Sequence, residues 1–588
     1  MAKKGRKIDY YSRKAVMRGG DKSIMVGAID VETEGLGGRL LMCQWGIMNQ
    51  VFTDSGPDMV ANMFDFVLQY AGNVVWYSHF AQYDWRYFMV YLTERGYPIE
   101  IGMRTETDIY EIRITNADGD QVILRDSYAL FNSPLAKLAS SFCPELPKLS
   151  IDIEHFNPHD PEHIEYAKRD VWILLIGLPR LFDLIKEHFG IDAGATTAGT
   201  ALRAWQATLK EDEIYNASEF GAREDFVRQA YYGGIVFMTT NKPVQKAWTV
   251  DVNSSYPSVM DDYGVPYGRA IESVDWQNGS LGVYRCRVRA PLDLVVAILP
   301  ARNDKGGMRW YSGEFETVVT NIEMEFAVAH GYEILEVYEG IYYEETVFPF
   351  HDFIAKCKFL RFNFRDLPEE MLAKLMQNSL YGKYGTRRQR LRMMSAMMMT
   401  DEDFIGAMPY DEDGLWYVIK EVDQEMLCMP EWATFITARA RLKLLTAVYA
   451  IGPTNAIYGD TDSITFKDGF AHLIDIGLEY GQWKLEKEWQ VFRAIAPKVY
   501  SGILADGKWK GAAKGLPRKG ITDVHWKLLL EDGKASATTL SLPSLRVAMK
   551  TGVKPARQLT RRSSDLRNSS NFVADLEGNV RTKTPDKG

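Results

Sequence analysis

The stretch Tyr458-Gly-Asp460-Thr-Asp462-Ser463 places two carboxylates two residues apart, with apolar runs directly before and after it. Short apolar runs on both sides of a tight polar centre predict a β-hairpin with both acids crowded at its turn. Two like charges held this close are unfavourable unless a cation neutralises them, so the pattern favours Mg²⁺ or Mn²⁺. A solvated acidic turn would also contain Asp-x-Asp, and other segments of the chain decide between the two interpretations.

The first of these segments, 248–257, is an apolar, β-branched run that reaches Asp251 and then turns toward Ser258. This pattern predicts a strand that delivers a carboxylate at its end and is followed at once by a helix. Asp251 is therefore a candidate partner for the two acids of the hairpin.

The second segment starts at Asp366, which with Glu369 three residues later resembles a capping box, and Pro368 is tolerated in the first turn of a helix. Gly382 is a reasonable stop for this helix, although the helix could run further. Three polar side chains then fall at i, i+4 and i+7 on one helical face: Lys374, Asn378 and Tyr381. An ammonium, an amide and a phenol in one row could suit a triphosphate, a sugar and a base. An exposed amphipathic face would give the same row.

The amino-terminal third contains a second set of acids. The run 23–32 predicts a buried strand ending in Asp30 and Glu32, whose i, i+2 spacing directs them to one face. Asp160 and Pro161 then predict the start of a helix, with Asp as N-cap and Pro at the first position.

That helix carries Tyr166 and Asp170 at i and i+4, hence on one face, and Asp84 lies between the strand and the helix in sequence. An Asp-x-Glu pair with two distant aspartates suits a site for two metal ions, with a tyrosine to orient water. Each piece alone is a weak signal, and an Asp-x-Glu at the end of a strand is more often surface than a site.

Taken in order, the segments around 251, 374 and 458 resemble motifs A, B and C of family B DNA polymerases: Asp-x-x-Ser-x-Tyr-Pro, Lys-x-x-x-Asn-Ser-x-Tyr-Gly and Tyr-x-Asp-Thr-Asp-Ser. The resemblance implies template-directed DNA synthesis by phosphoryl transfer between two metal ions. It implies that Asp251 and Asp462 bridge the metals, that Asp460 supports them, and that Val252 belongs to the metal ligands.

The same resemblance implies a nucleotide pocket. Lys374 would hold the triphosphate, while Asn378 and Tyr381 would line the pocket. Tyr256 resembles the steric gate that collides with a ribose 2′-hydroxyl. A second cation for the triphosphate would be Arg361 or Arg365, and the sequence does not decide between them.

The amino-terminal acids resemble the three motifs of a 3′–5′ proofreading exonuclease, which implies a second metal site at Asp30, Glu32, Asp84 and Asp170 with Tyr166 beside it. Lys148 matches an exonuclease lysine. The phage relatives usually carry an asparagine a few residues before the second-motif aspartate, whereas this chain has His79 and Phe80 at the comparable positions. That departure puts the single-strand contact there in doubt, but not the metal site.

Further segments resemble DNA contacts of the family. Ser127 and Tyr128 match a segment that holds a frayed 3′ end, although an ordinary strand edge would look the same. The remaining matches are a Tyr-x-Gly-Gly segment, a template-side Thr-x-x-x-Arg pattern and a Lys-x-Tyr segment at the primer terminus, which give Tyr231, Gly233, Gly234, Arg441, Lys498 and Tyr500.

The spacing of the motifs resembles the protein-primed polymerases of small linear-genome phages and related mobile elements. The expected fold is α/β with an α+β palm: an RNase H-like exonuclease domain at 1–192 and a right-hand polymerase at 193–588. Within the latter we expect insertions at 258–350 and 386–432, fingers at about 351–385 and a thumb at about 505–588. In such enzymes the first insertion docks a terminal protein and the second encircles DNA.

Bulk properties allow this interpretation. The chain has 588 residues, 46% of them hydrophobic, and a net charge of −9 that argues only superficially against nucleic acid, because two acidic sites can outweigh a basic groove. Its five cysteines form no Cys-x-x-Cys pair, which predicts neither zinc nor disulfides. We find no membrane-spanning run and expect a cytoplasmic monomer, within a host cell if the source is viral.

The expected partners are therefore primer–template DNA, deoxynucleoside triphosphates and a terminal protein, with two Mg²⁺ or Mn²⁺ ions at each active site. Three alternatives remain open. The chain could be a family B enzyme that uses nucleic-acid primers or no primer, a nuclease whose polymerase half only binds DNA, or a non-catalytic DNA-binding scaffold.

Overall fold

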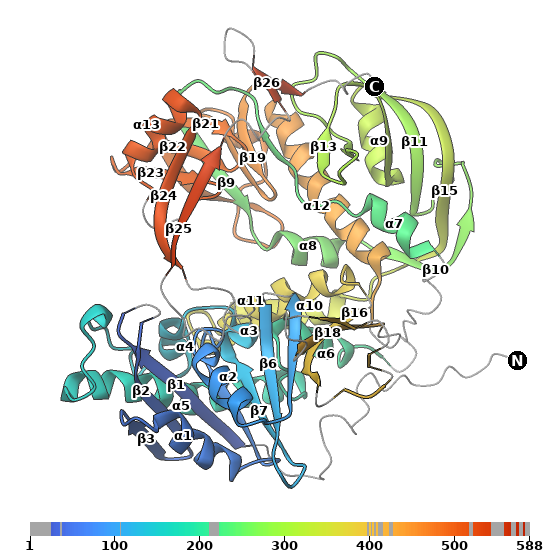
Figure 1. Cartoon of the computed structure of the whole chain (residues 1–588). Helices are drawn as coiled ribbons and strands as arrows, with labels where there is room; N and C mark the ends of the chain where they lie inside the picture. Colours follow the sequence, from blue (N-terminus) through green and yellow to red (C-terminus); the bar gives the residue numbers. More distant parts are fainter. Residues whose placement is uncertain are drawn as a thin grey trace, which may run out of the picture.

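The computed structural model of the chain describes residues 25–35, 38–105, 108–210, 223–387, 389–396, 399–401, 403–404, 407–409, 416–422, 427–516, 521–541, 558–565, 572–574 and 580–582. Three predicted segments, 1–192, 386–432 and 505–588, extend over residues that are not in these ranges. Those parts of the segments lie outside the described residues. Figure 1 shows a lobe formed by the first third of the chain, a second lobe formed largely by green and orange elements, and helices α10 and α11 between them.

The amino-terminal lobe is built on a sheet with the strand order β17-β18-β16-β5-β6-β7-β4-β1-β2-β3. Its strands from the first third are β1 (Met25–Thr33), β2 (Leu40–Ile47), β3 (Gln50–Asp54), β4 (Val74–Ser78), β5 (Ile99–Thr105), β6 (Asp108–Thr115) and β7 (Gln121–Asp126). Strand β4 runs parallel to both of its neighbours, β1 and β7. The carboxyl ends of these three strands therefore meet at one edge of the sheet.

Helices cover this sheet. They are α1 (Met59–Leu68), α2 (Trp85–Glu94), α3 (Ser127–Phe131), α4 (Leu135–Phe142) and α5 (Pro161–Phe189), with a 3₁₀ turn at Ile153–His155. The predicted start of α5 is confirmed, because Asp160 accepts a hydrogen bond from the amide of Glu162 (2.8 Å) and Pro161 is the first helical residue. Helix α5 packs against β1, β2 and β3 and fixes the face on which its polar residues lie.

The segment predicted as the second insertion joins the amino-terminal sheet. Strand β16 (Gln389–Ser395) pairs antiparallel with β5, with Leu391 opposite Met103, and β18 (Trp416–Val422) and β17 (Met408–Pro409) continue the sheet. The side chain of Met393 is fully buried in the core of the amino-terminal lobe. The two parts of the chain thus share one sheet and one hydrophobic core.

Helices α6 (Thr197–Gln206), α10 (His351–Asn363) and α11 (Pro368–Tyr384) connect the lobes. The predicted capping of α11 by Asp366 and Glu369 is wrong. The helix begins after Leu367 without a side-chain cap, and the amide of Asp366, whose φ is 62°, donates instead to the carboxylate of Glu370 (2.7 Å). Pro368 does occupy the first turn, and the helix continues past Gly382.

The second lobe contains a central sheet with the order β23-β22-β21-β9-β20-β19-β8. Its strands are β8 (Val236–Met238), β9 (Val244–Val252), β19 (Ala456–Asp460), β20 (Ser463–Lys467), β21 (Trp483–Ala496), β22 (Val499–Leu504) and β23 (Trp509–Ala513). The largely buried helix α12 (Pro430–Ile451) packs its carboxyl-terminal half into the same core as β9 and β20. Strand β23 extends this sheet past residue 505, where the thumb was predicted to start.

Helices α7 (Glu224–Ala230) and α8 (Ser255–Asp262) flank the central sheet. The chain ends with α13 (Asp523–Asp532) and the paired strands β24 (Lys534–Ser541) with β25 (Gln558–Asp565), and β26 (Phe572–Ala574) with β27 (Val580–Thr582). All five cysteines are buried, and none of them is in a disulfide bond. Among the helices that the structure describes, none combines the length and apolarity needed to cross a membrane.

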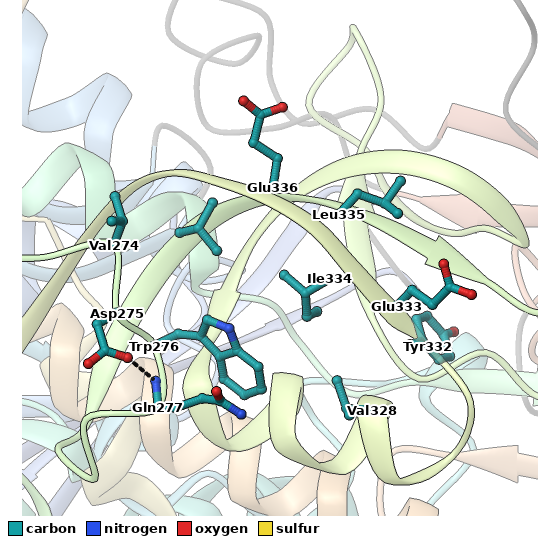
Figure 2. A pocket seen from close by; sticks show the side chains of 11 residues that line it. Val274, Asp275, Trp276, Gln277, Val328, Tyr332, Glu333, Ile334, Leu335 and Glu336 are labelled. Carbon is teal, nitrogen blue, oxygen red and sulfur yellow. Dashed lines mark hydrogen bonds between the residues drawn. The ribbon is translucent and has the colours of Figure 1, made fainter.

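The predicted first insertion is a separate sheet in the order β10-β15-β11-β14, backed by α9 (Asn321–Ala329). Its strands are β10 (Val265–Glu272), β11 (Gly282–Ala290), β14 (Gly313–Thr320) and β15 (Glu333–Val347), with a small hairpin of β12 (Pro300–Arg302) and β13 (Met308–Trp310). A pocket of about 540 Å³ lies beside this sheet. Figure 2 shows Trp276, Val328 and Ile334 among the side chains that line it. None of the predicted site residues lines this pocket.

Candidate active sites

The hairpin predicted from Asp-x-Asp is confirmed. Strands β19 and β20 pair with Asp460 opposite Ser463, and Thr461 adopts a φ of 64° in the turn between them. Strand β9 pairs with β20 on its other edge, with Asp251 opposite Ser463, and the amide of Val252 donates to the carbonyl of Asp462 (2.9 Å). The sheet therefore brings Asp251 beside the two acids of the hairpin.

The electrostatics of this site are those of crowded, partly buried acids. Burial, and then the charge of Asp462, raises the pKa of Asp251 to about 7. The pKa of Asp462 is also raised, again chiefly by burial. Asp460 has a counter-charge, because Lys498 Nζ lies 3.1 Å from its Oδ1. Lys498 thus neutralises the charge of Asp460. The charges of Asp251 and Asp462 are left to a bound cation or to protons.

Gly234 has a steric reason to be glycine. A Cβ at this position would lie 2.7 Å from the Oγ1 and Cγ2 atoms of Thr461, and the amide of Thr461 donates to the carbonyl of Ile235 (2.8 Å). At Gly233, in contrast, a Cβ would meet no atom within 4 Å. The lack of a side chain at Gly234 therefore lets the backbone pack against the acidic turn, a role that the sequence did not indicate. Of the two glycines, only Gly233 has open space where a Cβ would lie.

The residues predicted for nucleotide binding come together from α8 and α11. The rings of Tyr256 and Tyr381 stack with centroids 4.0 Å apart and an interplanar angle of 13°. Lys374 and Asn378 are exposed on the same helix as Tyr381. A stacked aromatic wall with an ammonium and an amide along one helix is compatible with a nucleotide pocket.

The two arginines of the predicted pair differ in their surroundings. Arg361 is half-buried and donates to the hydroxyl groups of Ser254 (2.6 Å) and Tyr480 (3.2 Å), whereas Arg365 is exposed. Gln377, which is fully buried, also joins this network, since it donates to Ser254 (3.2 Å) and accepts from Tyr480 (2.6 Å). The sequence missed Gln377; its only signal was a polar residue at a core position of α11.

Arg441 does not have the place that was predicted for it. Its side chain is 1% exposed, forms two hydrogen bonds with Glu323 Oε1 (3.0 and 2.7 Å), and donates to the carbonyls of Tyr232 (2.7 Å) and Gly233 (3.1 Å). A buried guanidinium with these partners has no surface to offer a DNA strand. The predicted direct contact is therefore corrected: Arg441 positions the Tyr-Tyr-Gly-Gly segment instead.

The other predicted DNA contacts surround the central site. Tyr231 follows α7 and packs closely against Gly385, where an added Cβ would lie 2.5 Å from the Tyr231 hydroxyl. Tyr500 packs against the ring of Tyr458 (5.5 Å between centroids), and the amide of Lys498 donates to the Tyr458 hydroxyl (3.0 Å). The Lys-x-Tyr segment therefore contacts the first residue of the hairpin motif.

The amino-terminal acids also come together. Gln44 of β2 lies opposite Asp30 of β1, and its Nε2 donates to Asp30 (2.8 Å) and to Glu32 (3.4 Å). Burial and then the charge of Asp170 raise the pKa of Asp30 to about 7, and burial also raises the pKa values of Glu32, Asp84 and Asp170. Gln44 was missed by the sequence reasoning, although it is the one polar residue in an otherwise apolar strand.

Lys148 is the cation that faces this cluster. Its ammonium pairs with the carboxylate of Asp170, lies 4.7 Å from the centre of the Tyr166 ring and 3.5 Å from the Tyr166 hydroxyl. Tyr166 and Asp170 thus lie on the same face of α5, as their spacing predicted. Lys148 connects them from the loop that precedes the helix.

Within the described parts of the chain, no group of three or more His, Cys, Asp or Glu side chains is spaced closely enough to hold a metal ion. Two oxygens of the amino-terminal cluster are nevertheless buried without a hydrogen-bond partner among the described residues, Asp84 Oδ2 and Asp170 Oδ1. Buried, acceptor-only carboxylate oxygens are costly unless a cation or a proton meets them. The chemistry of this donor set therefore fits a divalent cation such as Mg²⁺ or Mn²⁺.

The segment around Ser127 and Tyr128 lies beside this cluster. Ser127 Oγ donates to the carbonyl of Ser78 (2.9 Å), and Tyr128 stacks against Phe80. The predicted alternative of an ordinary strand edge does not hold, because the residues begin the one-turn helix α3 after β7.

Comparison with known proteins finds similarity to DNA polymerases. The family described as DNA polymerase type B, organellar and viral, matches residues 157–407. The DNA polymerase of Bacillus phage Nf is 27% identical over 369 residues, which cover 58% of this chain and 60% of that protein. The polymerase of Bacillus phage phi29 is 25% identical over 408 residues, covering 64% and 67% respectively.

The fold agrees as well. A structure of phi29 DNA polymerase with primer–template DNA matches with a TM-score of 0.72 at 19% identity, covering 92% of this chain and all of that one. The predicted fold, an exonuclease domain followed by a right-hand polymerase, is thereby confirmed. Over residues 157–407 the chain matches that family of type B DNA polymerases, and it is similar in sequence to the phi29-like phage enzymes and in fold to phi29 DNA polymerase. Its alignment spans about 60% of the length of the Nf enzyme.

Proposed function

We propose that this protein is a DNA-directed DNA polymerase that also removes nucleotides from 3′ ends. The observation that carries the proposal is the convergence of Asp251 and the Asp460–Asp462 turn on adjacent strands, beside the stacked rings of Tyr256 and Tyr381. Two separated sets of buried or partly buried acids, one in each lobe, support two separate phosphoryl-transfer sites rather than one.

At the polymerase site, Asp251, Asp462 and the backbone of Val252 would hold divalent ions, with Asp460 in support. DNA polymerases of this family generally use such ions, and we propose two Mg²⁺ ions per site. When bound, the ions activate the attacking hydroxyl and stabilise the leaving pyrophosphate. Lys498, which pairs with Asp460, would orient the primer terminus.

The protein's own task at this site is to bind and orient the nucleotide. Lys374 and either Arg361 or Arg365 would contact the triphosphate, and the Tyr381 ring would form part of the pocket wall with Asn378. Tyr256, held flat against Tyr381, would exclude a ribose 2′-hydroxyl by its bulk.

At the exonuclease site, Asp30, Glu32, Asp84 and Asp170 would hold the ions. Lys148 and Tyr166 lie beside Asp170, and the Tyr166 hydroxyl would orient the water that attacks the terminal phosphodiester. Gln44 fixes the first two carboxylates by donating to both of them.

We further propose that replication starts on a protein hydroxyl in a phage or mobile element. The similarity to phi29-like polymerases and the presence of a folded sheet between α8 and α10, where a terminal protein would dock, support this context. Solved structures of phi29 DNA polymerase contain primer–template DNA and incoming nucleotides, and we propose the same substrates here.

The test is primer extension on a labelled primer–template with Mg²⁺, with and without deoxynucleotides. Asp462→Ala is expected to abolish incorporation and leave 3′ shortening largely intact, while the double variant Asp30→Ala/Glu32→Ala is expected to do the reverse. If a single substitution removed both activities from folded protein, the assignment of two sites would be wrong. Shortening without extension by the native protein would favour the nuclease alternative.

Protein priming has its own assay. Template without primer, a labelled nucleotide and a candidate terminal protein should yield a labelled protein that survives denaturing electrophoresis. Labelled product that forms equally without the terminal protein would instead support primer-independent initiation on nucleic acid.

A further inference from the structure

Two aromatic rings lie at the edge of the sheet where the exonuclease acids gather. Strands β4 and β7 are parallel and end with Ser78 opposite Asp126, so the residues that follow each strand emerge side by side. There the rings of Phe80 and Tyr128 stack, with centroids 3.9 Å apart and an interplanar angle of 23°. Because β1 is the parallel neighbour of β4 and pairs with it up to Ala28, its Asp30 lies at this same end of the sheet.

Phe80 is held in place at a conformational cost. Its φ is 59°, a left-handed conformation that residues with bulky side chains rarely adopt, and its side chain is 50% exposed to solvent. The carboxylate of Asp126 accepts hydrogen bonds from the amides of Phe80, Ala81 and Tyr128, so one buried acid fastens both aromatic residues. A single exposed phenylalanine is ordinary on a protein surface. An exposed phenylalanine that is held in a strained conformation against a second ring requires an explanation.

His79 completes the wall. Ser127 Oγ donates its hydrogen to the carbonyl of Ser78 (2.9 Å) and therefore accepts from Nδ1 of His79 (2.9 Å). The imidazole meets both aromatic rings edge-on, with centroid distances of 5.2 Å to Phe80 and 5.9 Å to Tyr128. The three rings form one supported surface whose outer side is the exposed face of Phe80.

We propose that the exposed face of Phe80, backed by Tyr128, is a stacking platform for an unpaired base near the 3′ end of a single strand bound in the exonuclease site. The proposal rests on the exonuclease function proposed above. Every base has a π-face, so stacking on an aromatic ring binds single strands without regard to sequence. His79, which meets both rings edge-on, acts as a positioning residue.

The test is steady-state exonuclease kinetics on single-stranded oligonucleotides. Phe80→Ala is expected to raise KM by roughly five- to hundred-fold, the range that loss of one stacked base implies, with little change in kcat. Phe80→Trp should retain a KM close to the native value. Met48→Ala is the matched control, because Met48 is another exposed apolar residue of the same lobe (62%) with a similar φ of 54°.

A second readout separates stacking from mere structural support. A series of oligonucleotides with one abasic site at each of the last three positions should contain one position at which the missing base raises KM for the native protein. At that position Phe80→Ala should show no further loss. If the abasic series affects both proteins alike, or if Phe80→Ala leaves KM unchanged while the native protein degrades the strand, the platform is refuted. Absence of any exonuclease activity in the native protein would instead refute the function on which the platform rests.

Discussion

The buried pair of Arg441 and Glu323 allows a test of whether Arg441 stabilises the fold or contacts DNA, as the sequence predicted. Both side chains are 1% exposed, and Glu323 also accepts hydrogen bonds from the amide (3.3 Å) and the hydroxyl (2.8 Å) of Thr320 at the start of α9. The pair connects α12 to the first insertion, and through the carbonyls of Tyr232 and Gly233 to the segment beside the acidic turn.

Replacing Arg441 by Met leaves the Glu323 carboxylate buried without its counter-ion. Loss of one partner of a buried pair costs about 3–5 kcal/mol. A large domain shifts its Tm by about 2 °C for each kcal/mol, so the expected decrease in Tm is about 6–10 °C. The double variant Arg441→Met/Glu323→Gln should recover much of this loss, because it removes the stranded charge together with its partner.

The assay is thermal unfolding followed by near-ultraviolet circular dichroism, with binding of primer–template DNA measured well below the transition. Arg439→Met is the matched control, since Arg439 lies two residues away on α12 and its guanidinium packs over the ring of Tyr263 rather than against a buried acid. If Arg441→Met kept the native Tm but lost DNA affinity, with a shallower salt dependence, the direct DNA contact expected from the sequence would be right and the present reasoning wrong.

Two further predictions concern the two sheets. Gly234→Ala should decrease kcat for nucleotide incorporation by about ten- to hundred-fold in primer-extension kinetics, because its Cβ would displace the turn at Thr461. The double variant Gly234→Ala/Thr461→Gly should restore part of this kcat. A single variant as active as the native protein would refute the packing argument. Burial alone would raise the pKa of Glu111, but the guanidinium groups of Arg125 and Arg113 outweigh it and lower that pKa below its ordinary value of 4.5. The stabilisation by this acid is therefore complete above that value and lost as the pH falls through the lower folded pKa, so urea unfolding at pH 7 should show Glu111→Gln to be destabilised and the difference should shrink in acid.

The sequence by itself determined the elements that depend on local chemistry. The apolar runs around Asp460 and Asp462 were sufficient to predict their hairpin, because a two-residue polar turn between short strands leaves few other conformations. Asp160 and Pro161 were sufficient to predict the start of α5, since an N-cap acceptor and a fixed φ act within one turn. The order of the motifs was sufficient to predict the fold class.

Only the tertiary structure decided what depends on neighbours distant in the chain. Arg441 is polar in any sequence analysis, and it is buried because Glu323, more than a hundred residues earlier, is folded against it. Gly234 is constrained by Thr461, and Gln44 acquires its role from strand pairing opposite Asp30. The strands of the second insertion likewise join the amino-terminal sheet through β5, because an open sheet edge gains hydrogen bonds from any strand that the chain can bring to it. Such pairings are set by the packing of whole elements, and no local sequence signal determines which elements meet.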